Sequence, residues 1–273
     1  MAILFKADTH TYTSIDPSEN ITWTSVTGII SKHKKPFDAD AIAAKSVKNN
    51  WSKWYGMTET DVKEAWRNES QKAVNLGTWY HNQRELAYTS CSTIEKDGCI
   101  VPIFKPVEID GIKNAPDQKL VEGIYPEHMT YLKSAGLCGQ ADRIEVINGK
   151  VNIYDYKTNK EIKTKSYINW EGVSDKMLDP VNHLDDCNLN HYSLQLSFYM
   201  YMILKHNPRL KPGKMIIEHI LFEEAGKDAY DNRIVKYDDF GEPVVQEIVQ
   251  YDVPYLKTEV INIINRLKEN VKA

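Results

Sequence analysis

The stretch CGQADRIEVINGKVNIYDYKT, residues 138–158, is the most strongly patterned part of this 273-residue chain. The dipeptide Asn148-Gly149 stands between two runs of β-prone residues, and this arrangement is a strong signal of a hairpin with a two-residue turn. Such a turn sets the strand pairing, so that Ile147 faces Lys150. The sequence therefore predicts a β-hairpin of known register.

This register brings two carboxylates together. Counting outward from the turn gives the facing pairs Val146–Val151, Ile144–Ile153 and Asp142–Asp155. Side chains alternate along strands, so Lys157 shares a face with Asp155. Facing Cβ atoms lie about 4.5–5.5 Å apart, where like charges destabilise a sheet. We expect Lys157 and a divalent cation such as Mg²⁺ or Mn²⁺, which prefers oxygen ligands, to offset the repulsion.

An Asp-x-Lys sequence near the end of a strand also has an ordinary explanation, a solvated edge or a surface ion pair. An isolated Asp155 and Lys157 would favour that explanation. The opposing Asp142 leaves one negative charge unmatched at a half-buried position, which favours a metal site. A purely structural cluster of Asp142, Asp155 and Lys157 remains the alternative.

Composition sets broad limits on the rest of the chain. A hydrophobic content of 42%, with 10% aromatic residues, is enough for a substantial core. No stretch approaches the roughly 18 consecutive apolar residues of a membrane span, so we expect a soluble protein of the cytoplasm, in a bacterial or phage-infected cell. The net charge of -4 neither favours nor excludes a nucleic-acid partner. The four cysteines are widely spaced and are expected to be buried free thiols.

The remaining elements follow from capping, periodicity and turn signals. We expect an N-terminal hairpin of residues 3–14 and 20–25, then a helix capped by Thr24 or Ser25, and another capped by Asp38. The longest helix is expected over 58–90, with a break near Asn68. Further predictions are an insertion or mobile loop over 159–188, a helix over 189–207, strands over 214–224 and 232–240, and a closing helix over 254–273. The simplest division is one domain, 1–273, with 1–70 as decoration and 71–273 as the core.

Four short motifs occur in a fixed order along the chain. They are Gly77-Thr78-Trp79-Tyr80-His81, Gly139-Gln140-Ala141-Asp142, Asp155-Tyr156-Lys157-Thr158 and Gln195-Leu196-Ser197-Phe198-Tyr199. In this order they resemble the PD-(D/E)XK nuclease superfamily and, within it, the RecB-like branch. Residues 22–30 and 37–45 are also similar to segments preceding the core in phage nucleases and in the mitochondrial genome maintenance exonuclease. The resemblance implies an α/β, restriction-endonuclease-like core, a central mixed β-sheet flanked by helices, with a mainly helical N-terminal portion.

The resemblance also implies roles for individual residues. His81, Asp142 and Asp155 would be metal ligands, joined by the backbone carbonyl of Tyr156, and Lys157 would position or activate the attacking water. One or two Mg²⁺ or Mn²⁺ ions are expected, and an imidazole ligand favours Mn²⁺. The alternative for His81 is an ordinary hydrogen-bonded helix histidine. The cysteine spacing departs from the branch that carries an iron–sulfur cluster, so no cluster is predicted.

Three further residues are supporting candidates. Gln195 and Tyr199 lie on one face of their helix, where they contact either the site or a nucleic-acid strand, or else simply pack in the core. Glu122 stands upstream of Asp142, where related nucleases often have an acidic residue, although Glu127 competes with it for this position.

The function implied by the resemblance is that of a metal-dependent deoxyribonuclease, an exonuclease acting on single-stranded DNA ends or flaps in replication, recombination or repair. DNA is the expected partner, and no membrane is. The alternatives are a nucleic-acid-binding module without cleavage, an RNase, or a phosphohydrolase of small esters. Candidate strand-binding residues are Lys32, Lys34, Lys35, Trp51, Lys53, Trp54, Tyr55, Lys160, Lys163 and Lys165.

Overall fold

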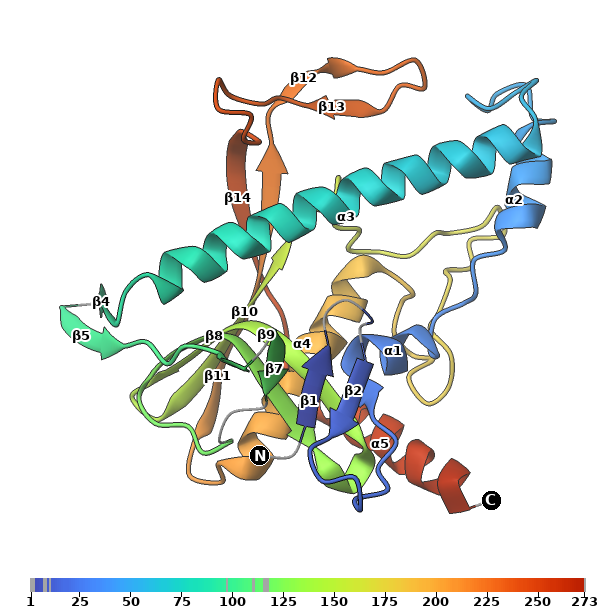
Figure 1. Ribbon diagram of the computed structural model, residues 1–273. Coiled ribbons are helices and arrows are strands. Elements are labelled where there is room, and N and C mark those ends of the chain that lie inside the picture. Colours follow the sequence, from blue (N-terminus) through green and yellow to red (C-terminus); the bar gives the residue numbers. More distant parts are fainter. Residues whose placement is uncertain are drawn as a thin grey trace.

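The computed structural model describes residues 3–6, 9, 11–96, 98–109, 111–114 and 118–272. Its centre is a six-stranded sheet in the order β14-β11-β10-β9-β3, with β8 also paired to β9. β10 and β11 are parallel, whereas β9 and β14 run antiparallel to their neighbours β10 and β11. Helices cover this sheet, as Figure 1 shows. The expected mixed sheet flanked by helices is therefore confirmed.

The elements have the following bounds. The strands are β1 Ile3–Lys6, β2 Thr11–Ser14, β3 Thr24–Ser25, β4 Thr93–Lys96, β5 Cys99–Pro102, β6 Val107–Ile109, β7 Ile112–Asn114, β8 Gly123–Leu132, β9 Leu137–Ile147, β10 Lys150–Lys157, β11 Lys211–Phe222, β12 Glu224–Lys227, β13 Arg233–Val235 and β14 Val245–Asp252. The helices are α1 Val26–Ser31, α2 Ala39–Ser46, α3 Glu59–Thr89, α4 Asn188–His206 and α5 Lys257–Lys272.

The β9–β10 hairpin forms in the predicted register. Ile147 pairs with Lys150, and the ladder continues as far as Arg143 and Tyr154. Asn148 and Gly149 both have left-handed backbones, with φ of 51° and 68°, as a tight hairpin turn requires. The prediction from the Asn-Gly pair is thus confirmed.

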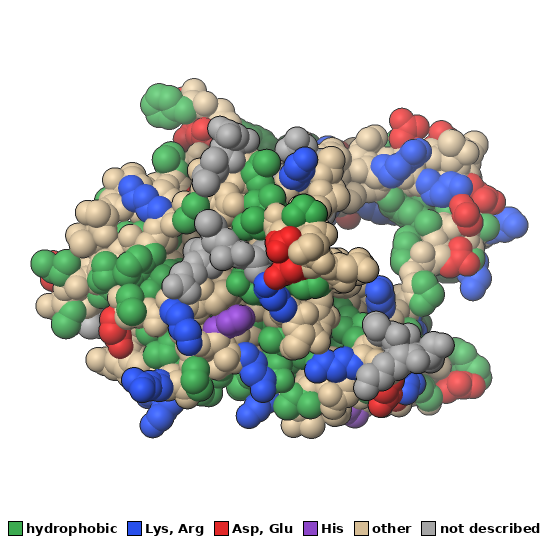
Figure 2. Space-filling view, turned by 60° about the horizontal axis from the view of Figure 1, so that its bottom comes forward, with side chains coloured by type: hydrophobic (Ala, Val, Ile, Leu, Met, Phe, Trp, Pro, Cys, Tyr) green, Lys and Arg blue, Asp and Glu red, His purple; other side chains and the backbone are tan. Residues whose placement is uncertain are grey.

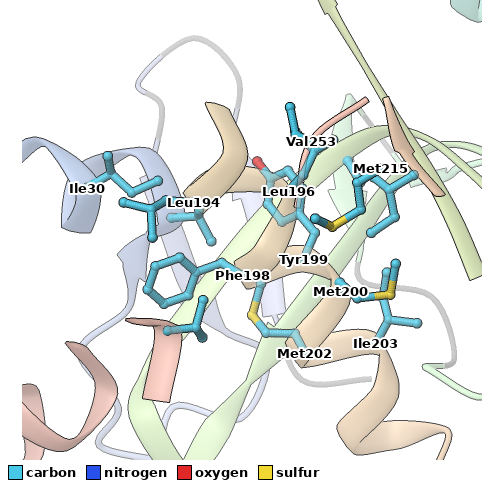
Figure 3. Close-up of a cluster of buried hydrophobic side chains, with 14 of the residues drawn as sticks. Ile30, Leu194, Leu196, Phe198, Tyr199, Met200, Met202, Ile203, Met215 and Val253 are labelled. Atoms are coloured by element: carbon cyan, nitrogen blue, oxygen red, sulfur yellow. The ribbon is translucent and has the colours of Figure 1, made fainter. Parts of the chain in front are cut away.

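The main core lies between the sheet and α4. Figure 3 shows side chains of this helix filling the space, among them Leu194, Phe198 and Met202. Val151 and Ile153 of β10 are fully buried in the same cluster. Each such side chain stabilises the fold by roughly 1.5–3 kcal/mol relative to an exposed one. α4 therefore holds β10, and the residues at its end, in a fixed place.

The helix α3 crosses one side of the sheet and contacts β8, as Figure 1 shows. It begins where the sequence predicted, and Thr58 caps it by accepting a hydrogen bond from Asp61 N. The expected break near Asn68 is wrong, because α3 runs unbroken from Glu59 to Thr89 and so continues through the proposed internal division at residue 70. Good helix formers around Asn68 carry the helix past this single unfavourable residue.

The N-terminal prediction needs correction. β1 and β2, both inside residues 3–14, pair with each other, and β1 also pairs with β7. Residues 20–25 contribute only the short β3, which joins the central sheet beside β9. This parallel pairing is long-range, so local turn signals could not reveal it. The caps Ser25 and Asp38 are confirmed at α1 and α2.

The described residues of the C-terminal half contain two strands that were not predicted, β12 and β14. β14 pairs with β11 at the edge of the sheet, and the strand predicted over 232–240 is limited to β13, which pairs with β12. Hydrogen bonds attach the stretch 159–187 to the α1–α2 connection, from Leu178 N to His33 O and from Lys35 N to Asp186 Oδ2.

The four cysteines are all free, but only two are buried as expected. Cys138 and Cys187 are buried, whereas Cys91 and Cys99 are exposed. In the described part of the chain, no helix has both the length and the apolar character needed to cross a membrane.

Candidate active site

The end of β10 holds a buried ion pair. Asp155 is only 1% exposed, and its Oδ2 pairs with the ammonium group of Lys157. α3 passes close to this point, since a Cβ added to Gly77 would lie 3.3 Å from Thr158 Oγ1. The glycine of the first motif therefore allows the helix to approach the end of β10.

β9 and β10 separate just before this pair. Their ladder ends at Arg143 and Tyr154, and beyond it Asp142 Oδ2 accepts a hydrogen bond from Tyr156 N at 2.6 Å. The expected direct pairing of Asp142 with Asp155 is therefore absent from the ladder. The Asp142 carboxylate, and not a backbone carbonyl of β9, accepts the hydrogen bond from Tyr156 N. The two acids still lie near each other, and the charge of Asp142 helps to raise the pKa of Asp155.

Asp142 also belongs to a group of three side chains that could hold a metal ion. His81, Glu127 and Asp142 each offer a ligand atom, and these atoms lie within 4.8 Å of one another. His81 Nδ1 is 3.6 Å from Asp142 Oδ1 and 3.7 Å from Glu127 Oε1. His81 comes from α3, Glu127 from β8 and Asp142 from β9, so residues far apart in sequence converge here.

Glu127 reaches this group through a local irregularity of β8. Pairing with β9 skips Glu127, and its φ of 49° is left-handed. This conformation is uncommon for a residue other than glycine and costs on the order of 1 kcal/mol. Strain of this kind is typical of functional sites.

Glu122 does not lie in this group. Its two carboxylate oxygens accept hydrogen bonds from Asn148 N and Gly149 N, at 2.9 and 2.7 Å. Glu122 therefore fastens the β9–β10 turn, at the far end of the hairpin from Asp142. The expectation for Glu122 is corrected in favour of its competitor Glu127.

The charges of the site shift one another's pKa values. Burial lowers the pKa of His81, but the carboxylates of Asp142, Glu127 and Asp155 outweigh it and raise the value to about 9. Burial raises the pKa of Asp155 to about 6, against the opposing effect of Lys157. Burial lowers the pKa of Lys157, yet Asp155 and Asp142 raise it above its usual value, so Lys157 is a cation at neutral pH.

The Q-x-x-x-Y motif supports Asp155 directly. Gln195 Nε2 donates a hydrogen bond to Asp155 Oδ1 at 3.2 Å and another to the Tyr199 hydroxyl at 3.2 Å. The Tyr199 ring packs on Gly139, where an added Cβ would lie 2.7 Å from Cε1. Gln195 thus supports the site and Tyr199 packs in the core, so both of the roles considered for this motif occur.

The comparison with protein families matches residues 32–272 to the model of the PD-(D/E)XK nuclease superfamily. The chain belongs to this superfamily. The comparison with curated proteins finds no match, and the comparison with solved structures finds none. Membership indicates a metal-dependent nuclease that acts on nucleic acid.

The donor set of the nuclease suits a divalent cation. Carboxylate oxygens and an imidazole nitrogen are ligands that Mn²⁺ accepts, and Mg²⁺ accepts the oxygens. Among the residues described, Glu127 Oε1 is buried without a hydrogen-bond partner, whereas Asp155 Oδ2 has the Lys157 ammonium group beside it. Buried oxygens of this kind are usually satisfied by a partner, and a cation would supply one. The residues present therefore fit a metal.

A cavity of about 260 Å³ opens beside these ligands. Glu127, Gly139, Asp142, Gln195 and Tyr199 line one side of it. The other side comes from the N-terminal part of the nuclease, namely Phe5, Tyr12 and residues 25–27. Part of the cavity wall therefore lies outside the matched range of residues 32–272.

The candidate strand-binding residues are only partly available. Trp51 is 96% exposed, but Trp54 is buried. Lys53 donates to Tyr230 O and Asn232 Oδ1, and Lys160 pairs with Glu69. Figure 2 shows Lys and Arg side chains spread over one face of the nuclease, which is deeply hollowed beside the end that carries α2.

Proposed function

We propose that this nuclease is a RecB-like deoxyribonuclease, with residues 3–272 acting as one domain, and that it shortens DNA from single-stranded ends or flaps. The observation that carries the proposal is the convergence of Asp142, Glu127 and His81 beside the Asp155–Lys157 pair. These residue types, on three strands and one helix, supply cation ligands and a proton-bearing group at one point.

The bound cation would polarise the scissile phosphate and lower the pKa of the attacking water. Asp142, Asp155, Glu127 and His81 would hold it, with the Tyr156 carbonyl as a further ligand. The imidazole of His81 favours Mn²⁺, while the carboxylates accept Mg²⁺ equally well. One or two ions are compatible with this set of ligands.

Lys157 has a different task. Its ammonium group carries three N–H donors, stays protonated and is held beside Asp155, so it can orient the attacking water or donate to a phosphate oxygen as negative charge develops. Its amine also lies 4.8 Å from the centre of the Tyr192 ring, which limits its movement. Gln195 positions Asp155 through its hydrogen bond.

An unpaired strand as substrate is supported by exposed aromatic side chains. Trp51 is 96% and Trp170 is 90% exposed, and such rings can stack on bases without regard to sequence. The hollow beside α2 in Figure 2 offers room for a strand rather than a closed pocket for a small ester. The exposed rings and the open hollow are both consistent with a DNase that acts at strand ends, and an RNase is the second candidate function.

The test is hydrolysis of end-labelled DNA, single- and double-stranded, and of labelled RNA, in Mn²⁺, Mg²⁺ or EDTA. Wild-type protein is compared with Lys157→Ala and with Lys150→Ala, which changes an exposed lysine on the same strand. We expect metal-dependent loss of single-stranded DNA from its ends, abolished by Lys157→Ala alone. Equal activity of all three proteins would refute the assigned chemistry, and internal cleavage would refute action at ends.

A further inference from the structure

A second cavity, of about 370 Å³, lies between α3 and the β12–β13 hairpin. In Figure 1, β11 and β14 extend past α3 and lead to this hairpin, which reaches toward α2. The floor of the cavity comes from β11, at Ile220, Leu221 and Phe222. We call it the hairpin pocket. Its volume lies within the range of roughly 300–1,000 Å³ that is typical of small-ligand sites.

The hairpin pocket adjoins the candidate active site. Thr158 and Asn159 line it, and they follow Lys157 directly in the chain. On α3, the pocket residue Leu76 precedes His81 by five positions, which is about 7.5 Å along the helix axis. The pocket therefore begins at the residue that follows Lys157, at the edge of the candidate active site.

The walls are held in place by contacts at both ends of the hairpin. Lys53 Nζ donates to Tyr230 O at 2.7 Å, and the rings of Trp54 and Tyr230 lie 5.4 Å apart. Trp79 Nε1, on α3, donates to the Glu242 carboxylate beyond the hairpin. The pocket is therefore formed before any ligand arrives, which lowers the entropic cost of binding.

The charges around the hairpin pocket cancel. Glu69 pairs with both Lys72 and Lys160 at 2.8 Å, and Arg233 pairs with Glu224 at 2.9 Å. The rim therefore offers little net attraction to a phosphate. The walls are mainly apolar, with the Tyr237 ring on one side, and they suit a flat, uncharged group with polar edges.

We propose that the hairpin pocket holds one nucleobase of the substrate strand, next to the phosphodiester at the candidate active site. This inference rests on the proposed nuclease function and adds a subsite to it. The occupant is a base rather than a phosphate because the rim is neutral, and it belongs to the substrate because the pocket is continuous with the end of β10.

The test fills the pocket from α3. Ala73→Trp places a large side chain on the lining, and Val74→Trp is the matched control, on the same helix at a position 56% exposed and outside the lining. Binding of a labelled oligothymidylate is measured in EDTA, where no hydrolysis occurs. Hydrolysis of the same strand and of bis(p-nitrophenyl) phosphate is measured in Mn²⁺.

We expect Ala73→Trp to weaken oligothymidylate binding on the order of tenfold, as the loss of one stacked base does, and to raise KM similarly. Hydrolysis of the small ester should stay within twofold of wild type, and Val74→Trp should match wild type throughout. Tyr237→Ala, with the 92% exposed Phe240 changed to Ala as control, repeats the test from the opposite wall.

Equal binding by Ala73→Trp and Val74→Trp, or no binding by the wild type, would overturn the pocket assignment. Pocket-dependent binding without hydrolysis in any metal would instead support the base site and refute the proposed nuclease reaction. The two proposals therefore fail in different ways.

Discussion

Gly139→Ala tests why a glycine precedes Asp142 by three positions. The new methyl carbon would lie 2.7 Å from Cε1 of Tyr199 and 3.4 Å from its Cζ and hydroxyl oxygen. Carbon atoms in contact prefer about 3.5–4.0 Å, so the ring must move by about 1 Å. Tyr199 is buried on α4, and a shift of its ring would disturb its hydrogen bond with Gln195. Overpacking of this kind costs about 1–3 kcal/mol.

Whether Gly139→Ala raises or lowers the free energy of unfolding is informative. Gly139 lies outside the left-handed region, and alanine at such a glycine otherwise stabilises a protein by about 0.4–1 kcal/mol. The clash should reverse that gain and should also displace Gln195, which hydrogen-bonds to both Tyr199 and Asp155. We expect a lower free energy of unfolding and reduced kcat for DNA hydrolysis.

The assay is denaturant unfolding of a double-mutant cycle, with Gly139→Ala made in wild-type and in Tyr199→Leu backgrounds. Without the ring, the added methyl group should cost at least 1 kcal/mol less. The same cost in both backgrounds would show that contact with Tyr199 is not the reason for glycine at this position.

Three further predictions concern the site and its support. The pKa of Asp155 is raised to about 6 and that of His81 to about 9, so at a pH below these values a cation must displace a proton to bind. Mg²⁺ affinity, measured by calorimetry, should therefore rise from pH 6 to pH 9. An affinity that does not change with pH would contradict this prediction. Glu127→Gln should weaken Mg²⁺ binding at least tenfold. Glu122→Gln should leave Mg²⁺ binding unchanged but lower the free energy of unfolding by about 0.5–1.5 kcal/mol, because it weakens the two exposed hydrogen bonds to the β9–β10 turn, and the reverse pattern would restore Glu122 as a ligand. Arg143→Leu should cost about 3–5 kcal/mol in denaturant unfolding, because it removes the cation beside the buried Glu218 and one of the two cations beside Glu145, and a loss below 1 kcal/mol would show that these carboxylates are otherwise compensated.

The sequence was most informative where a local signal sets geometry. The Asn148-Gly149 turn gave the register of β9 and β10, and the predicted caps at Ser25 and Asp38 gave the starts of two helices. Each of these depends on neighbours within a few residues. Local chemistry is therefore enough to predict them.

The features that the sequence left open or did not reveal depend on long-range pairing. Glu127 joins the site because β8 pairs with β9 and is interrupted opposite Asp142, and no tight turn announces that pairing. Gly136 could have indicated this pairing, because it ends the turn between β8 and β9 with a left-handed φ of 58°. With that turn recognised, counting outward would have placed Glu127 opposite Asp142. The separation of β9 from β10 at Asp142 depends on a side-chain hydrogen bond, which periodicity does not reveal.

Binding of Mn²⁺ tests the central claim most directly, and calorimetry can measure it for the wild type, Asp142→Asn and Asp40→Asn. Asp40 is an acid outside the site that pairs with Lys63 on the surface. We predict that the wild type and Asp40→Asn bind Mn²⁺ alike and that Asp142→Asn binds at least tenfold more weakly. Undiminished binding by Asp142→Asn would contradict the assignment of the metal site.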